Sequence, residues 1–123
     1  MQQRLGLRNV EVIALAVTDL ARAQQFYGEV LGLPVAEEAG LVLGYRLGGS
    51  ILMLKDDGER APTEQPNPRV TLAVDAALET QAALQALGVR VADPVALYDE
   101  AFLVGSFLDS EGNKLWFCSP KGG

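Results

Sequence analysis

The chemistry open to this chain of 123 residues is limited first by the side chains that it lacks. It contains no histidine and a single cysteine, Cys118. The absence of histidine excludes Ser-His-Asp and Cys-His catalytic groups and every histidine-ligated metal. One cysteine forms neither an intramolecular disulfide nor a cysteine-based zinc site. No evident base accompanies Cys118 to activate it as a nucleophile, and a free cysteine is usually a small hydrophobic residue.

The composition is typical of a globular domain with an acidic surface. Hydrophobic residues make up 49% of the chain and charged residues 21%, and the formal net charge is −6. Such a surface mildly favours cationic ligands, although its plainest role is solubility. It argues against nucleic acid as a partner, because phosphates require clustered lysines and arginines. No apolar run approaches the roughly 20 residues that span a bilayer, and no secretory signal is evident, so we expect a cytoplasmic protein without a membrane partner.

The first half of the chain has the pattern of a strand, a helix and three shorter strands. Residues 10–17 are rich in β-branched and aliphatic side chains, which indicates a strand. Thr18 and Asp19 can cap a helix over 20–31, which carries an apolar stripe and ends at Gly32. The shorter strands are predicted at 34–38, 41–47 and 50–55.

The second half repeats this pattern after a linker. Residues 56–68 are polar and contain three prolines, as is typical of a linker. The runs LGLPVA at 31–36 and LGVRVA at 87–92 occupy matching places in the two halves. Self-similarity at a nearly constant offset indicates a duplicated supersecondary unit. The elements predicted for the second copy are a strand at 69–74, a helix at 76–87 and strands near 95–98, 101–108 and 113–118.

Two stretches of the sequence resemble the vicinal-oxygen-chelate superfamily of glyoxalase I, extradiol dioxygenases, and fosfomycin- and bleomycin-resistance proteins. The opening stretch is VTDLARAQQFY at 17–27, followed by VLGL at 30–33. The closing stretch is FLDSEGN at 107–113, followed by LWF at 115–117. The resemblance covers residues 9–119 or so.

This resemblance implies an α+β fold in which two tandem βαβββ modules form a curved mixed sheet around an open cup. It also implies a homodimer, as is usual for the drug-sequestering resistance proteins. We therefore predict one domain over 1–123, with module one at about 9–56, a linker at 56–68 and module two at about 69–119.

The catalytic members of this family hold a metal ion in the cup through four ligands, mostly His and Glu. The resemblance places the four ligand positions at Val12, Met53, Arg69 and Trp116. Valine has no donor atom, and a methionine thioether is a soft ligand suited to Cu(I). The indole nitrogen only donates, and a guanidinium repels a cation. A one-residue shift would offer Glu11 in the first strand but no set of ligands, so we expect no metal and no cofactor.

Strand alternation on this alignment assigns the side chains to two faces. The face opposite the cup is uniformly large and apolar, as expected of a surface that packs against helices. The cup itself is mostly apolar, with Arg69 and Thr71 as polar exceptions and Trp116 as an aromatic wall. Such a surface suits a small organic ligand better than an ion. Besides the four ligand positions, the residues predicted to face the cup are Ala14, Ala16, Ile51, Thr71, Ala73, Lys114 and Cys118.

Arg69 has two interpretations. Its planar fork could hold a carboxylate or phosphate while Trp116 stacks on the ligand. Alternatively, Arg69 stacks on Trp116 itself, or pairs with Glu11 or another carboxylate. Two tyrosines could also border the cup and donate a hydroxyl group. The candidate ligand-binding residues are thus Arg69, Trp116, Met53, Val12, Thr71, Tyr45 and Tyr98, and no catalytic residue is identified.

Three functions fit these observations. The first is a metal-independent protein that binds, and in this way sequesters, a small organic drug or metabolite. The second is a metal-independent enzyme, such as a lyase or isomerase, on the same fold. The third is a degenerate module whose cup is filled by its own side chains and serves for protein contact. An open pocket lined by Trp116 and Arg69 would favour the first, and a filled cup the third.

Overall fold

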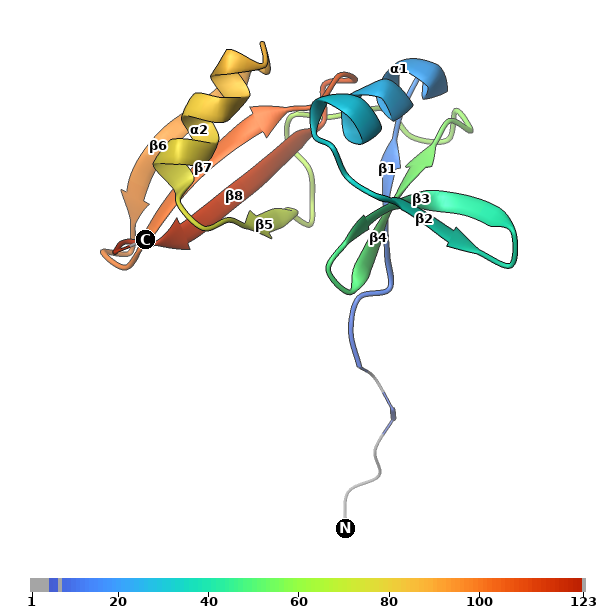
Figure 1. Ribbon diagram of the computed structural model, residues 1–123, viewed down its shortest axis with the longest axis horizontal. Helices are drawn as coiled ribbons and strands as arrows, with labels where there is room; N and C mark the ends of the chain where they lie inside the picture. The colour runs from blue at the N-terminus through green and yellow to red at the C-terminus, as the bar shows by residue number, and fades with distance from the viewer. Residues whose placement is uncertain (1–4, 7, 123) are drawn as a thin grey trace. The chain divides into compact units, whose positions relative to one another are not determined.

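The computed structural model describes residues 5, 6 and 8–122, and the chain divides into two compact units between Asp57 and Gly58 (Figure 1). The division falls at the start of the predicted linker. Each unit contains one helical segment and one four-stranded sheet. Within the described residues, no helix combines the length and apolarity needed to cross a membrane. The grouping of both units into one domain over 1–123 stays a prediction.

The first unit begins with a strand and a capped helix, as predicted. The Asp19 side chain accepts a hydrogen bond from the Arg22 backbone N–H at 3.0 Å, which satisfies a free donor of the first helical turn. The predicted helix over 20–31 is an α-helix that continues as a π-helix. Its sheet has the order β1-β4-β3-β2, with β1 parallel to β4 and the other pairs antiparallel. The elements are β1 (Val12–Ala16), α1 (Leu20–Gln25), η1 (Phe26–Val30), β2 (Val35–Glu38), β3 (Leu41–Leu47) and β4 (Ser50–Lys55).

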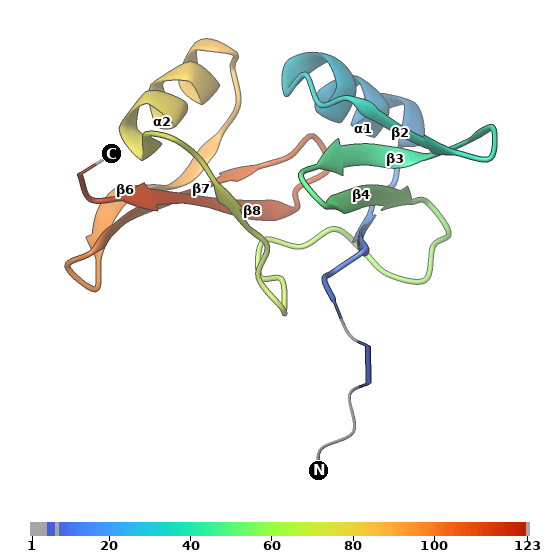
Figure 2. The same ribbon diagram turned by 60° about the horizontal axis from the view of Figure 1, so that its bottom comes forward.

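The second unit has the same connectivity. Its sheet has the order β5-β8-β7-β6, with β5 parallel to β8 and the other pairs antiparallel. In both views, the helix of each unit lies on one side of that unit's own sheet (Figure 1 and Figure 2). The α+β class and the duplicated βαβββ module are therefore confirmed. The elements are β5 (Thr71–Ala73), α2 (Ala77–Ala86), β6 (Val91–Tyr98), β7 (Phe102–Leu108) and β8 (Lys114–Pro120).

The predicted alternation of faces is clearest in β8. Leu115 and Phe117 are fully buried, whereas Lys114, Trp116 and Cys118 between them are partly exposed. The first unit departs from this pattern at Ile51, which was assigned to the open face but is buried together with its neighbour Leu52. On its face of the sheet, Ile51 is flanked by its cross-strand neighbours, Val12 of β1 and Arg46 of β3.

Two glycines occupy equivalent positions in the two units, Gly44 in β3 and Gly105 in β7. A Cβ on Gly44 would lie 2.0 Å from the carbonyl oxygen of Leu52. A Cβ on Gly105 would lie 2.9 Å from both the Phe117 ring and a Val95 methyl group. The strand pairing also shifts register beside each glycine. Both sheets therefore bend at a point where only a residue without a side chain fits.

The second helix receives its N-terminal cap from another strand. Ala76, the N-cap residue of α2, offers no side-chain acceptor. The hydroxyl oxygen of Ser119, at the end of β8, accepts instead from the Ala77 backbone N–H at 2.9 Å. Ser119 is 1% exposed, so this hydrogen bond is shielded from water.

Ser119→Ala is expected to destabilise the protein by about 1 to 2 kcal/mol, because it removes a buried cap and leaves a donor without a partner. Urea unfolding followed by circular dichroism measures the change. Ser110→Ala, at the β7–β8 turn, is the matched control, with an expected change below about 0.5 kcal/mol. Equal losses for the two variants would contradict the assigned capping role.

Candidate functional site

The second unit carries a cavity of about 690 Å³ on the sheet face opposite Leu115 and Phe117. All four strands of this sheet contribute to it. Its size falls within the roughly 300 to 1,000 Å³ typical of pockets for small organic molecules. The apolar lining comes from Pro94, Ala96, Leu97, Tyr98, Phe102, Val104 and Trp116, and the polar lining from Arg69, Thr71, Asp93 and Cys118.

The parallel pairing of β5 with β8 brings most of the predicted site residues together. Thr71 pairs with Trp116, and Ala73 pairs with Cys118. The Trp116 backbone N–H donates to the carbonyl oxygen of Val70 at 2.9 Å, which continues the pairing to the start of β5. Arg69 lies two residues before Thr71, and these two side chains, the polar exceptions predicted for the cup, line one cavity with Trp116.

Arg69 stacks on Trp116. Its guanidinium carbon lies 4.2 Å from the centroid of the indole ring, and the Nζ atom of Lys114 lies 5.2 Å from the same ring. Both distances are within the roughly 6 Å over which a cation is attracted by an aromatic face. Across the described part of the chain, Arg69 makes no ion pair with a carboxylate. The predicted stack of Arg69 on Trp116 is therefore observed, and the binding of an anion by Arg69 stays a prediction.

Asp93 forms the centre of a small polar network at the edge of the pocket. Its Oδ2 atom accepts hydrogen bonds from Lys114 Nζ at 2.7 Å and from the Ser106 hydroxyl. The Asp93 backbone N–H donates to the Ser106 hydroxyl oxygen at 3.0 Å. The hydrogen bond from Lys114, then that from Ser106, holds the pKa of Asp93 below its ordinary value. Asp93 is thus ionised at neutral pH, and Lys114 balances its charge.

The lowered pKa of Asp93 predicts an acid-dependent loss of stability. A carboxyl group with a lower pKa in the folded state stabilises that state above its unfolded pKa, and the contribution is lost as the pH falls through the folded value. Asp93→Asn should therefore lower the thermal midpoint near neutral pH, and its effect should shrink as the pH falls below the ordinary carboxyl pKa of 3.8 and through the lower folded value. A pH series of melting curves measures this. The exposed Asp56→Asn is the control, and the prediction fails if both variants show the same pH dependence.

The remaining predicted residues lie elsewhere. Val12 and Met53 belong to the first unit, on the paired strands β1 and β4, and are not among the lining residues of this cavity. Tyr45 is 8% exposed, and its hydroxyl donates to the carbonyl oxygen of Gln24 at 3.2 Å. Burial, and secondarily Glu29, raises the pKa of Tyr45. Its ring also stacks near Tyr27, so Tyr45 lies in the core beside the helix and does not line this cavity, and its part in ligand binding stays a prediction.

Half of the pocket was not apparent from the sequence. The sequence pattern placed the start of the sixth strand at 95, whereas β6 begins at Val91 and includes Pro94. A proline normally argues against a strand because it lacks an N–H group. Here β6 is an edge strand, and its pairing with β7 shifts register between Asp93 and Ala96, which accommodates the proline. The large hydrophobic residues Leu97 and Phe102, which flank the predicted turn near the already predicted Tyr98, were the available signal, and the structure leaves all three exposed.

A smaller cavity of about 230 Å³ shares residues with this pocket. Arg69, Lys114 and Trp116 line it together with residues 64–66 of the predicted linker. The linker is held in place by Asn113, whose side-chain oxygen accepts from the Thr63 backbone N–H at 3.0 Å. The segment that follows Gly58 is therefore part of the second unit and forms one wall beside Arg69.

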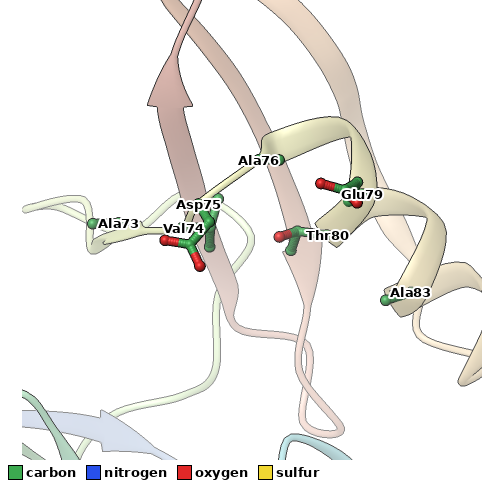
Figure 3. A pocket seen from close by; sticks show the side chains of 7 residues that line it. All are labelled: Ala73, Val74, Asp75, Ala76, Glu79, Thr80 and Ala83. Carbon is green, nitrogen blue, oxygen red and sulfur yellow. The ribbon is translucent and has the colours of Figure 1, made fainter. Parts of the chain in front are cut away.

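A third hollow, of about 490 Å³, lies where β5 leads into α2 (Figure 3). The figure shows the carboxylates of Asp75 and Glu79 beside it, with alanines forming much of the remaining lining. The entire lining comes from the single stretch 73–83. It contains neither an aromatic side chain nor a cation, and we assign no ligand to it.

The side chains at the family's metal positions do not fit a metal ion. Val12, Met53, Arg69 and Trp116 supply no oxygen or imidazole donor and include a fixed positive charge. Within residues 5, 6 and 8–122, no three His, Cys, Asp or Glu side chains cluster in a way that could hold a metal. We derive no chemical step through a metal.

The chain thus combines a duplicated βαβββ module with a cavity on one face of the sheet of its second unit. The sequence model of the Glyoxalase/Bleomycin resistance protein/Dioxygenase superfamily matches residues 9–117, and the chain belongs to this superfamily. No curated protein matches the sequence.

Solved structures share the fold. A lactoylglutathione lyase from Agrobacterium tumefaciens is 22% identical, with a TM-score of 0.69 over 93% of this chain and 95% of that one. TnmS3, an antibiotic binding protein from Streptomyces sp. CB03234, is 23% identical, with a TM-score of 0.76 over 96% and 100%. A glyoxalase/dioxygenase from Nostoc punctiforme is 22% identical, with a TM-score of 0.72 over 98% and 96%. At these identities the likeness establishes the fold alone, which hosts both enzymes and binding proteins.

Proposed function

We propose that this protein binds a small organic ligand without a metal ion and acts by sequestering a drug or metabolite. The observation that carries the proposal is the cavity of about 690 Å³ with Trp116 in its wall. On the alignment that the resemblance implies, Arg69 and Trp116 stand at two of the family's metal positions, and this region presents a cation and an aromatic surface instead. The similarity in fold to an antibiotic binding protein supports this function.

The apolar surface beside the cavity supports binding over a degenerate module. Leu97, Tyr98 and Phe102 are 51%, 65% and 45% exposed, and all three line the cavity. Large hydrophobic side chains left open to solvent around a concave site are typical of a binding surface. A cup filled by its own side chains would have buried them. The homodimer implied by the resemblance is also part of the proposal.

The position of Trp116 provides a direct test, because it is the only tryptophan of the chain. We expect pocket ligands to change its intrinsic fluorescence saturably, and a chelator to leave their affinity unchanged. Native mass spectrometry of protein purified from its own host, with metal analysis of the same sample, would report ligand mass and oligomeric state. Turnover abolished by chelator would overturn the metal-independent function. Turnover that survives chelator would identify a metal-independent enzyme instead.

A further inference from the structure

We infer that the ligand of this pocket is an organic anion with a planar apolar body, and that Arg69 determines this specificity by binding the anionic group. The inference rests on the proposed function, since it names the class of ligand for the same site. It depends on the charges of the pocket, on the geometry around Arg69 and on the apolar wall that faces it.

The cation that lines the pocket, Arg69, lies near Asp93 but forms no salt bridge with it: Arg69 contributes through space to the lowered pKa of Asp93, after the hydrogen bonds from Lys114 and Ser106. Asp93 is paired with Lys114 at 2.7 Å and also accepts from Ser106, so its negative charge is already balanced. Arg69 makes no ion pair with any described carboxylate. The chain carries a formal charge of −6, whereas the two charged residues that line this pocket are Arg69 and Asp93, and Asp93 is bonded to Lys114 of the adjoining cavity. A cation that lacks a salt bridge and lies beside an apolar surface favours an anionic ligand.

The geometry allows Arg69 to bind an anion while it remains on Trp116. A guanidinium is planar and carries its N–H donors at the edge of the plane, so it can lie on an aromatic face and still donate to a carboxylate or a sulfonate. Thr71 lies two residues along β5 and lines the same cavity, where its hydroxyl can provide another donor. The indole ring of Trp116 therefore positions the guanidinium of Arg69, and the N–H donors of this guanidinium bind the anion in a fixed geometry.

The same contacts disfavour a cationic ligand. Arg69 and Lys114 already lie 4.2 Å and 5.2 Å from the centroid of the only indole of the pocket. A cationic ligand would have to displace them and would also meet a carboxylate, Asp93, that is already paired. The net charge of the chain alone, −6, would instead favour a cationic ligand.

The body of the ligand must suit the remaining surface. Leu97, Phe102 and Val104 supply apolar side chains from β6 and β7, while Trp116 supplies a broad flat surface from β8. Flat aromatic surfaces pack well against planar rings in offset or edge-to-face arrangements. The structure therefore favours an aromatic or otherwise planar body over a flexible polar one, such as a sugar.

Two fluorescent probes with the same aromatic skeleton test this inference. Anilinonaphthalene sulfonate carries an anionic group, and phenylnaphthylamine lacks it. Binding of each probe is measured by its own fluorescence with wild-type protein, Arg69→Met and Arg90→Met. Methionine retains an apolar stem that can cover Trp116, and Arg90→Met makes the same change in charge outside the pocket. Melting curves confirm that each variant is folded.

We expect Arg69→Met to weaken the sulfonate probe about ten-fold or more, as is typical when a charged hydrogen bond is lost, and the neutral probe less than about two-fold. Arg90→Met should change neither affinity. An equal loss of both probes in Arg69→Met would overturn the inference, because Arg69 would then only support Trp116, and the proposed function would stand. If neither probe binds, and no member of a wider panel changes Trp116 fluorescence, the proposed function itself fails.

Discussion

Replacement of Trp116 by alanine is expected to weaken ligand binding about 30-fold or more, because truncation of a central aromatic contact costs roughly 2 kcal/mol or more. Trp116 lines both the main cavity and the smaller one beside it. It also supports the Arg69 guanidinium at 4.2 Å, so its removal affects the apolar and the anionic parts of the site together. Calorimetry or the fluorescence of a bound probe measures the affinity, since the variant has no tryptophan.

Trp116→Phe is the matched control for this prediction. Phenylalanine retains a flat ring at the same position, and we expect it to preserve most of the affinity, within about five-fold. Trp116 is only partly buried and lies on the pocket face, so both variants should remain folded, which melting curves verify. A folded Trp116→Ala protein that binds as tightly as the wild type would remove Trp116 from the site.

The largest effect on folding is expected for Gly44→Ala, which should reduce the free energy of unfolding by about 3 kcal/mol or more. The added Cβ would lie 2.0 Å from the backbone carbonyl oxygen of Leu52, and neither atom belongs to a flexible side chain. Relief of this overlap would require β3 to move away from β4, the strand with which it pairs. The φ angle of Gly44, +154°, adds strain for any residue with a side chain.

Gly48→Ala separates the two causes. Gly48 also has a positive φ angle, +56°, but a Cβ there would meet no atom within 4 Å. Gly48→Ala should therefore reduce the free energy of unfolding only through the unfavourable left-handed backbone conformation, by about 1 to 2 kcal/mol. Urea unfolding of both variants under the same conditions measures the difference. Equal losses would show that close approach of the strands does not explain the glycine in β3.

The charge of the whole chain and the charge of its pocket favour different ligands. A formal charge of −6 mildly favours a cation as the partner. At the pocket, Asp93 is paired with Lys114 of the adjoining cavity, and Arg69 lines the pocket without a salt bridge to any described carboxylate. Interactions at contact distance in a partly desolvated site outweigh those of distant surface charges, which salt screens. Arg69, and not the net charge, is therefore the better guide to the ligand.

Most of the elements could be predicted from local patterns. The apolar stripe and the Asp19 cap of the first helix depend on residues close together in the sequence, and so does Gly32, which follows that helix. The alternation in β8 likewise follows from the period of a strand. Pro94 was different, since its place in an edge strand depends on a register shift against β7 that no local pattern encodes.

By itself, the sequence determined the duplicated module and the absence of histidine, because repetition and side-chain identity need no coordinates. It also placed Arg69, Thr71 and Trp116 on one face, because strand alternation and one alignment suffice. Only the tertiary structure decided which residues line the pocket and which do not. Asp93 lines the pocket and pairs with Lys114, whereas Tyr45 does not line it and donates its hydroxyl to the carbonyl oxygen of Gln24. Both outcomes depend on contacts between residues about 21 positions apart in the chain, which only folding brings together.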